Sequence, residues 1–246
     1  MAQRGLAVVT GAAGGIGASI CERLIGDGFA VAALDLDENG LAALAESHFS
    51  GLSRHKVDLT DEHQTRSAID KIEHAEGPIE ALVNVLGWTK GSRFDQETSD
   101  YWQKIIDINY KALLYVAQPV LVAMMGRQRG RMVFVASDAA RAGASGQAVY
   151  AGAKAAVIAF AKSLARENAR HGITVNCVAP GPTETPLFRR EQSDNPELVD
   201  RIIKTIPLRR PALTKEQAAA VSFLLSEDAG FITGQTISVS GGLTMV

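Results

Sequence analysis

Short apolar runs alternate with longer amphipathic segments along most of this chain. The short runs are rich in Val, Ile, Leu and Ala, and they read as continuous apolar stretches rather than alternating ones. Continuous runs are typical of strands buried on both faces, as in a parallel sheet covered by helices. The predicted strands span residues 6–10, 30–35, 53–57, 81–86, 131–136, 174–178 and 236–239.

The longer segments carry apolar residues at helical spacing and predict helices over residues 15–27, 38–48, 61–75, 99–126, 148–171 and 214–225. Alternation of strand and helix predicts an α/β fold, a doubly wound parallel sheet of about seven strands with helices on both faces. No linker or repeat interrupts the 246 residues, so we expect a single domain over 1–246. The proline-rich stretch from Pro180 to about Asn195 predicts an irregular loop of the kind that covers a site.

Composition excludes several classes of function. The net charge is −2 and no long basic run occurs, which argues against nucleic acid or an anionic membrane as the main partner. No apolar run approaches the roughly 20 residues of a membrane span, and the first residues show no signal-peptide pattern. Cys21 and Cys177 lie in apolar segments and predict reduced core thiols, which indicates a cytoplasmic protein. The five histidines have no metal-ligand spacing, so we expect no catalytic metal.

A glycine-rich turn, TGAAGGIG, follows the first predicted strand and opens a helix. Glycine lets the backbone turn tightly and approach a pyrophosphate, while the helix N-terminus offers N–H groups and a positive dipole end. Gly11, Gly15, Ile16 and Gly17 are therefore candidate cofactor-binding residues, although such a loop can also be only a turn.

Asp35 ends the second predicted strand and gives the glycine loop a second partner. A carboxylate at this place can accept hydrogen bonds from a ribose diol and repel a 2′-phosphate. Neither Gly14 nor Leu36 is basic, so nothing in the sequence would hold that phosphate. We therefore predict NAD rather than NADP, with the alternative that Asp35 only caps the turn or the next helix.

Tyr150 and Lys154 lie four residues apart in an Ala-rich helical segment and thus share one helix face. A lysine ammonium beside a phenol favours the phenolate, so we predict that Lys154 lowers the pKa of Tyr150. Tyr150 would then exchange a proton with a hydroxyl or carbonyl near neutral pH, unless the two are an ordinary surface pair. Ser137 ends the strand at 131–136 and can donate a hydrogen bond to the same oxygen.

The glycine spacing Gly-x-x-x-Gly-x-Gly, the Tyr150-x-x-x-Lys154 pair and Ser137 thirteen residues before Tyr150 resemble the short-chain dehydrogenase/reductase family, in its branch of about 250 residues. The resemblance covers essentially the whole chain and implies a Rossmann-like fold. Further positions that match the family are Thr10, Asp58, Asn84, Gly87, Asn109, Asn176, Pro180, Gly181, Thr183 and Thr185. Two positions depart from it: Val85 replaces an asparagine, which puts local rigidity in doubt, and Ser240 stands where many members carry aspartate.

The resemblance implies roles for these residues. Catalysis would use Asn109, Ser137, Tyr150 and Lys154, with Asn109 holding a water chain to Lys154 unless it only stabilises a helix kink. Lys154 would also contact the nicotinamide ribose, and Asp58 would face the adenine unless it caps the helix at 61. The cofactor-binding set is Gly11, Gly15, Ile16, Gly17, Asp35, Leu36, Asp58, Leu59, Asn84, Gly87, Tyr150, Lys154, Pro180, Gly181, Thr183 and Thr185.

Small residues after Ser137 leave room for a substrate, and nearby aromatic residues suggest an apolar or cyclic one. We predict a cyclic or aryl secondary alcohol and its ketone, within aromatic or alicyclic catabolism. Trp88 and Phe94 could instead be ordinary packing residues. The predicted pocket residues are Trp88, Phe94, Ala139, Gly143, Ala144, Gln147, Leu187 and Phe188.

Three alternatives remain open. Segments such as SDAAR and PGPTET resemble the family's 2-hydroxycyclohexanecarboxyl-CoA dehydrogenase, whose CoA ester could use Arg141, Arg189 and Arg190, unless these are solvated surface charges. A 3-oxoacyl-(acyl-carrier-protein) reductase shares the motifs, but the family's reductases normally use NADP. A nucleotide-sensing protein without catalysis would be expected to lack part of the Ser–Tyr–Lys set.

Apolar residues in segments 99–126 and 148–171 extend beyond one narrow stripe. Surplus apolar surface predicts association. By resemblance these helices pair across a dimer, and a homotetramer is expected.

Overall fold

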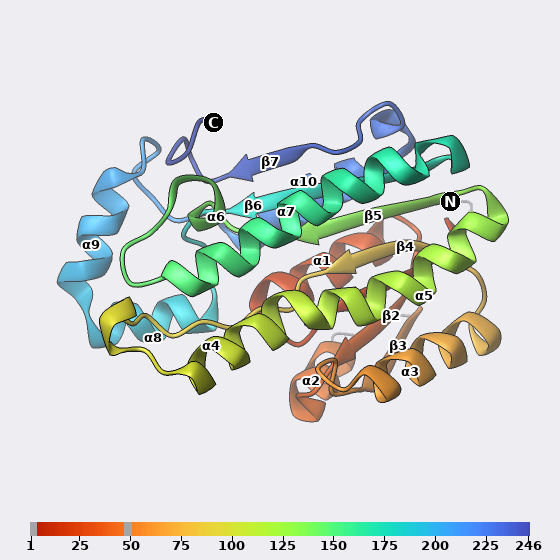
Figure 1. The fold of residues 1–246 in the computed structure, drawn as a ribbon, viewed down its shortest axis with the longest axis horizontal. Coiled ribbons are helices and arrows are strands. Elements are labelled where there is room, and N and C mark those ends of the chain that lie inside the picture. Colours follow the sequence, from red (N-terminus) through yellow and green to blue (C-terminus); the bar gives the residue numbers. More distant parts are fainter. Residues whose placement is uncertain (1–3, 47–50) are drawn as a thin grey trace.

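A computed structural model describes residues 4–46 and 51–246 of the protein. Seven parallel strands form one sheet in the order β3-β2-β1-β4-β5-β6-β7 (Figure 1), which confirms the predicted doubly wound sheet. The order reverses between β1 and β4, and ligands bind at such switch points beyond the carboxyl ends of the strands. The strands are β1 (Leu6–Thr10), β2 (Ala30–Asp35), β3 (Leu52–Lys56), β4 (Ile79–Asn84), β5 (Gly130–Val135), β6 (Ile173–Pro180) and β7 (Thr236–Val239).

Helices cover both faces of the sheet. Alternate residues of β1 point to opposite faces, so Ala7 and Val9 pack with one set of helices and Leu6 and Val8 with the other. The first face is covered by α1 (Gly15–Gly26), α2 (Glu38–Glu46) and α10 (Thr214–Leu225). The second is covered by α3 (Glu62–Ala75), α5 (Ala112–Arg127) and α7 (Ala148–Asn168). Burial on both faces explains the continuous apolar runs of the strands.

The predicted helix at 99–126 is interrupted. It consists of α4 (Ser99–Ile106), a π-helical turn (Asp107–Lys111) and α5, which contains Pro119. Most other predicted boundaries lie within two residues of those observed, as for β4, which runs over 79–84 rather than 81–86. The last two residues of the predicted helix at 38–48 lie outside the described residues.

The prediction of an irregular loop after Pro180 is wrong. The segment contains α8 (Pro186–Asp194) and is followed by α9 (Pro196–Thr205), both on the left of Figure 1. Each helix begins with a proline, whose missing N–H would have no partner in a first turn anyway. The Thr185 side chain caps α8 by accepting a hydrogen bond from the Phe188 N–H at 3.2 Å.

The expectation that no apolar stretch reaches membrane-span length also needs correction. Ser99–Arg127 and Ala148–His171 are long and apolar enough by length and composition alone, with 39% and 33% of their apolar windows buried. Both stretches nevertheless pack on the sheet, through buried residues such as Val116 and Val157. Cys21 and Cys177 are buried and free, as predicted for core thiols.

Candidate active site

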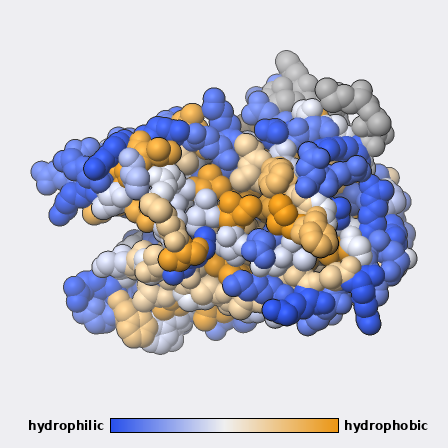
Figure 2. All heavy atoms as spheres, turned by 90° about the horizontal axis from the view of Figure 1, so that it is seen from above, coloured by the Kyte–Doolittle hydropathy of each residue, from blue (hydrophilic) through white to orange (hydrophobic). Residues whose placement is uncertain are grey.

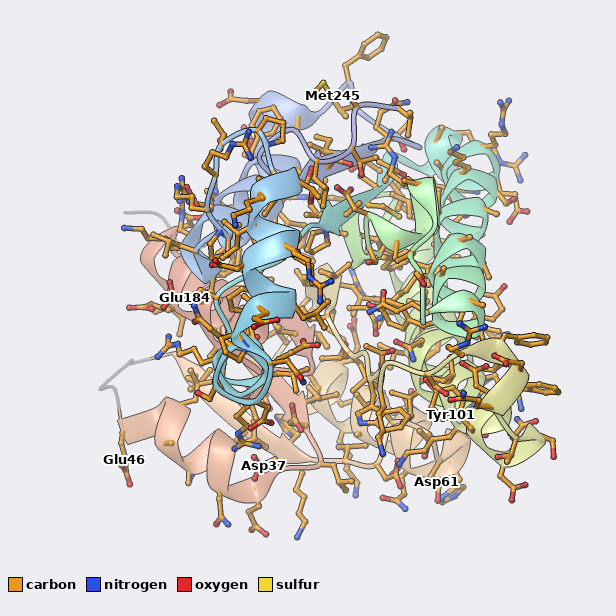
Figure 3. All side chains as sticks on the ribbon, turned by 90° about the vertical axis from the view of Figure 1, so that its left-hand side faces the viewer. Asp37, Glu46, Asp61, Tyr101, Glu184 and Met245 are labelled. Carbon is orange, nitrogen blue, oxygen red and sulfur yellow. The ribbon has the colours of Figure 1, made fainter. Side chains whose placement is uncertain are left out.

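A cleft of about 730 Å³ opens at the carboxyl ends of the strands. It is the hollow on the left of Figure 2, and Figure 3 faces this side of the molecule. Its walls come from the loops after β1, β2, β4, β5 and β6 and from α7 and α8. Most of the predicted catalytic and cofactor-binding residues therefore meet in one place.

The glycine loop after β1 has room only for glycine at several positions. Gly11 adopts φ +65°, and a Cβ there would lie 2.9 Å from the Leu86 nitrogen. A Cβ on Gly17 would lie 2.0 Å from the Gly11 oxygen, which no side chain could tolerate. The cap residue of α1, Gly14, has no side chain to accept the first-turn N–H groups. The loop thus fits the pyrophosphate of a dinucleotide.

Asp35 closes the far end of the cleft. Its Oδ2 accepts a hydrogen bond from the Ala13 N–H and its Oδ1 accepts one from the Asp37 N–H, both at 3.0 Å. Asp37 also lines the cleft, so two carboxylates face this end, and Lys154 is the one cation among the lining residues. Asp35 therefore fixes the glycine loop and places a carboxylate at this end of the cleft.

Three predicted residues at this end do not line the cleft. Leu36 is 60% exposed, and Leu59 is buried in the core. Asp58 Oδ1 accepts hydrogen bonds from the N–H and the hydroxyl of Thr60, at 2.9 and 2.6 Å. The cap of α3 is Asp61 rather than Asp58, because Asp61 accepts the Gln64 N–H at 2.9 Å.

Ser137, Tyr150 and Lys154 line the middle of the cleft together. Ser137 follows β5, and its Oγ accepts a hydrogen bond from the Ala139 N–H at 3.2 Å. Lys154 is 2% exposed, and its Nζ donates to the carbonyl oxygens of Val135 and Leu86 at 2.9 and 3.2 Å. Burial lowers the pKa of Lys154 to about 8.

The prediction that Lys154 lowers the pKa of Tyr150 is wrong for the protein alone. Burial raises the pKa of Tyr150, and a hydrogen bond from Ser137 opposes that rise in part. Lys154 does not lower the pKa of Tyr150 because its amine donates to backbone carbonyls and because burial disfavours its charged form. The prediction used the helical spacing of the pair but not the depth at which both side chains are buried.

Asn109 is fully buried in the π-helical turn between α4 and α5. Its Nδ2 donates to the carbonyls of Ile105 and Trp88, and its Oδ1 accepts the Trp88 N–H at 3.2 Å. A Cβ on Gly87 would lie 3.0 Å from Lys154 Nζ and 3.1 Å from Asn109 Oδ1. Asn109 therefore stabilises the helix irregularity and also approaches the glycine beside the lysine amine.

The other end of the cleft is formed after β6 by Pro180, Gly181, Thr183 and Thr185. A Cβ on Gly181 would lie 2.7 Å from the Cβ of Ser240, so β7 packs tightly against this loop. Asn84 and Asn176 act within the sheet. Asn84 Oδ1 accepts the Thr10 hydroxyl at 2.8 Å, and Asn176 Nδ2 donates to the Ile232 carbonyl at 2.8 Å.

Known proteins resemble the chain over nearly its whole length. A family model described as enoyl-(acyl carrier protein) reductase matches residues 11–244. The chain is 38% identical to an acetoacetyl-CoA reductase of an Acinetobacter species, over 100% of both chains. It is 38% identical to a 2,3-dihydroxy-2,3-dihydro-p-cumate dehydrogenase of Pseudomonas putida, over 98% of this chain and 95% of that one. The chain belongs to the short-chain dehydrogenase/reductase family.

Solved structures agree with this membership. The crystal structure of gox2181 matches this short-chain dehydrogenase/reductase with a TM-score of 0.95 and 31% identity, over 98% of this chain and 96% of that one. Actinorhodin polyketide ketoreductase with NADPH matches with a TM-score of 0.91 and 30% identity, over 97% and 96%. The chain is thus an oxidoreductase of the family that acts on CH–OH groups.

The predicted substrate residues of this short-chain dehydrogenase/reductase divide into two groups. Trp88 and Leu187 line the cleft, and Thr89 lines it as well, although the sequence did not single it out. Phe94 is 58% exposed and stacks on Trp102 with ring centroids 5.3 Å apart, so it is a surface packing residue. The predicted residues outside the cleft lining are Phe94, Ala139, Gly143, Ala144, Gln147 and Phe188.

A polar cluster beside Ser137 was also missed. Asp138 is 4% exposed, and its Oδ1 accepts the Ser238 hydroxyl at 2.5 Å. The Ser238 oxygen in turn accepts a hydrogen bond from Arg141 Nη1 at 2.7 Å. Arg141 therefore hydrogen-bonds to β7 and is not free to bind a CoA ester at the entrance of the cleft. Arg189 forms an ion pair with Glu184 at 3.4 Å, and Arg190 is exposed on α8. Only the three-dimensional structure brings residues 138 and 238 together.

Proposed function

We propose that the protein is an NAD-dependent oxidoreductase that interconverts a cyclic or aryl secondary alcohol and its ketone. The observation that carries this proposal is one cleft that holds Ser137, Tyr150 and Lys154 together with Asp35. The first three residues provide proton transfer, and the fourth selects the cofactor. A nucleotide sensor without catalysis would not need the first three.

The nicotinamide of bound NAD would take the hydride from the carbinol carbon and return it in the reverse direction. The residues of the chain handle the remaining proton. Tyr150 accepts the hydroxyl proton of the alcohol, or donates it to the ketone, and Ser137 donates a hydrogen bond to the same substrate oxygen. Burial raises the pKa of Tyr150, and the hydrogen bond from Ser137 opposes that rise, so Ser137 favours the ionised form that accepts the proton.

The preference for NAD rests on this chain's own residues. Asp35 and Asp37 face the end of the cleft beside the glycine loop, where a 2′-phosphate would meet two negative charges. Two of the similar solved structures are described with NADPH or NADP bound. The expected NAD preference therefore sets this chain apart from those structures.

The lining of the cleft supports an apolar cyclic substrate. Trp88 and Leu187 line the same cleft as Tyr150, and the relative from Pseudomonas putida is named for a cyclic dihydrodiol. The acetoacetyl-CoA reductase relative favours a second candidate, a 3-ketoacyl thioester. Because Arg141 is engaged with Ser238, we favour the cyclic or aryl alcohol over 2-hydroxycyclohexanecarboxyl-CoA. Free buried thiols are typical of the cytoplasm, where we propose that the enzyme acts.

The test is an absorbance assay of NADH and NADPH turnover with cyclic and aryl ketones, acetoacetyl-CoA and an acyl-carrier-protein thioester. We expect the highest kcat/KM for a cyclic or aryl ketone with NADH. Tyr150→Phe should lower kcat by about 10²- to 10⁴-fold, because the proton donor is lost. NADH should still bind, and Tyr115→Phe on α5 is the matched control with unchanged turnover.

Different outcomes would reject different parts of the proposal. Faster turnover with NADPH than with NADH would show that Asp35 does not select NAD. A higher kcat/KM for acetoacetyl-CoA would show that the substrate is a 3-ketoacyl thioester. NADH binding without turnover of any carbonyl compound would support the sensing alternative.

A further inference from the structure

Gln217 is a fully buried amide on α10 that no sequence motif singled out. Its Nε2 donates to Thr183 Oγ1 at 3.1 Å and to the Val239 carbonyl at 2.9 Å. Its Oε1 has no hydrogen-bond partner within the described part of the chain. One side chain therefore connects a helix, the last strand and the loop that ends the cleft.

This arrangement is not needed to satisfy the two acceptors. The Val239 carbonyl also accepts the Gly181 N–H at 3.2 Å, and the Thr183 hydroxyl donates to the Gly181 carbonyl at 2.9 Å. An unpaired buried oxygen is unfavourable, and a buried group of this kind calls for a reason other than folding. An apolar side chain of the same length would fill the space without leaving a polar atom unpaired.

The loop that Gln217 holds forms part of the cleft. Thr183 is 7% exposed and lines the cleft, and α8 begins three residues later at Pro186. The backbone of this loop is otherwise tied to Ala212, whose N–H donates to the Pro182 carbonyl at 2.9 Å. Gln217 adds a side-chain hydrogen bond from the interior, directly to a residue that lines the cleft.

The same helix also reaches the other end of the site. The Ser19 hydroxyl of α1 donates to Thr214 Oγ1 at 2.6 Å, at the first residue of α10. α10 thus contacts both the helix that follows the glycine loop and the loop after β6. A shift of one end of the site relative to the other is restrained through this helix.

We propose that Gln217 is a positioning residue that fixes Thr183 and thereby the end of the cofactor site formed after β6, an inference that rests on the proposed function. It does not touch the reacting atoms. Its effect is to keep the loop at residues 181–185 in the geometry that binds the cofactor before the cofactor arrives.

The experiment compares wild type, Gln217→Met and Gln217→Leu for NADH affinity by fluorescence titration and for thermal unfolding. We expect the Kd for NADH to rise about three- to tenfold, as for the loss of a positioning hydrogen bond. The unfolding temperature should stay unchanged or rise, because the unpaired oxygen is removed, the Val239 carbonyl still accepts the Gly181 N–H, and the Thr183 hydroxyl still donates to the Gly181 carbonyl. In a Thr183→Val background the same change at 217 should have little further effect.

Ser222→Ala is the matched control on the same helix, since the buried Ser222 hydroxyl donates to Asp27 Oδ2 at 2.5 Å, at the end of α1. It should lower the unfolding temperature and leave the Kd for NADH unchanged. Unaltered NADH affinity in both Gln217 variants, or failure of both to fold, would overturn the inference. If wild type binds neither NADH nor NADPH, the proposed function fails instead.

Discussion

Lys154 carries its amine into the interior, where it donates to the carbonyls of Val135 and Leu86 rather than to a carboxylate. Val135 is the last residue of β5, and Leu86 lies two residues after the end of β4. The carboxyl ends of two neighbouring strands therefore hold the amine in place. Burial without a counter-ion disfavours the cation, and this is why the pKa of Lys154 falls to about 8. Lys154 is therefore a group that opposes folding near neutral pH.

This leads to a prediction for stability against pH. Between about pH 8 and pH 10.5 the unfolded chain keeps a proton on Lys154 that the folded chain has released. Stability rises with pH wherever the unfolded state binds more protons. Wild type should therefore gain stability relative to Lys154→Met as the pH rises from 8 towards 10.5. Denaturant midpoints of both proteins at fixed concentration, from pH 7 to pH 10, provide the measurement.

The matched control is Lys162→Met, an exposed lysine two turns further along α7. The difference in denaturant midpoint between Lys162→Met and wild type should not vary in this pH range. Lys154 and Lys162 both act on the pKa of Cys177, but burial raises the pKa of Cys21 and Cys177 to about 12, so both thiols stay protonated in the folded proteins between pH 7 and pH 10 and their contribution cancels. A constant difference between wild type and Lys154→Met would show that the pKa of Lys154 is not lowered in the folded protein.

At the level of single residues, the sequence was a good guide to which side chains meet and a poor guide to their charge states. Helical spacing was enough to place Tyr150 beside Lys154, and the end of β2 was enough to place Asp35 in the cleft. The direction of the Tyr150 pKa shift comes from burial of the side chain in the folded protein, which outweighs the hydrogen bond from Ser137. Such burial has no local signal in the sequence.

Among the elements, β7 organises the site although it contributes no residue to the cleft lining. Ser238 connects to Asp138 and Arg141, close to Ser137 in sequence, and the Val239 carbonyl accepts the Gly181 N–H. Both walls of the central cleft are thus fastened to one strand. The position of Ser137 should depend on this strand as much as on β5.

We therefore expect Ser238→Ala to impair catalysis more than cofactor binding. The change leaves the buried Asp138 carboxylate without its hydroxyl partner and leaves Arg141 with only the Thr236 carbonyl on β7, so the turn that carries Ser137 can shift. Misplacement of a catalytic group lowers kcat, here by about tenfold or more. Steady-state kinetics with NADH titrations should show kcat reduced and the Kd for NADH within about twofold of wild type.

Ser238→Thr keeps the hydroxyl and should restore most of the activity. Ser163→Ala removes an exposed hydroxyl that donates to the Ala159 carbonyl on α7, and it should have no effect on kcat. Equal kcat in wild type and Ser238→Ala would mean that β5 alone positions Ser137.

The elements themselves were predictable where the apolar pattern was continuous. The inner strands β1, β2, β4, β5 and β6 followed from it, because burial on two faces leaves a strong signal, whereas the edge strands β3 and β7 contain no buried residue. α8 and α9 were missed because their prolines were read as loop residues, whereas Pro186 and Pro196 begin helices. α8 also has no buried residue, so it carries no apolar stripe that a pattern could detect.

For the whole molecule, the outer face of α5 and α7 exposes apolar side chains to solvent in the single chain. The two helical stretches are apolar enough to resemble membrane spans, yet only about a third of their apolar windows is buried in the single chain. A groove of about 340 Å³ between them is lined by Leu114, Tyr115, Leu121 and Phe160, with Arg66 of α3 at its edge. A second copy of the chain would cover this apolar surface.

We expect the enzyme to be a homotetramer in solution, with this face at one of its interfaces, and sedimentation velocity should give four times the chain mass of 26.1 kDa. Leu121→Arg places a charge in the groove and should shift the protein to smaller species, because an unpaired charge in an apolar interface is strongly unfavourable. Leu198→Arg on α9, a partly exposed leucine away from the groove, should leave the mass unchanged. Wild type that sediments as a monomer would leave the exposed apolar face of α5 and α7 without an explanation and would contradict this assembly.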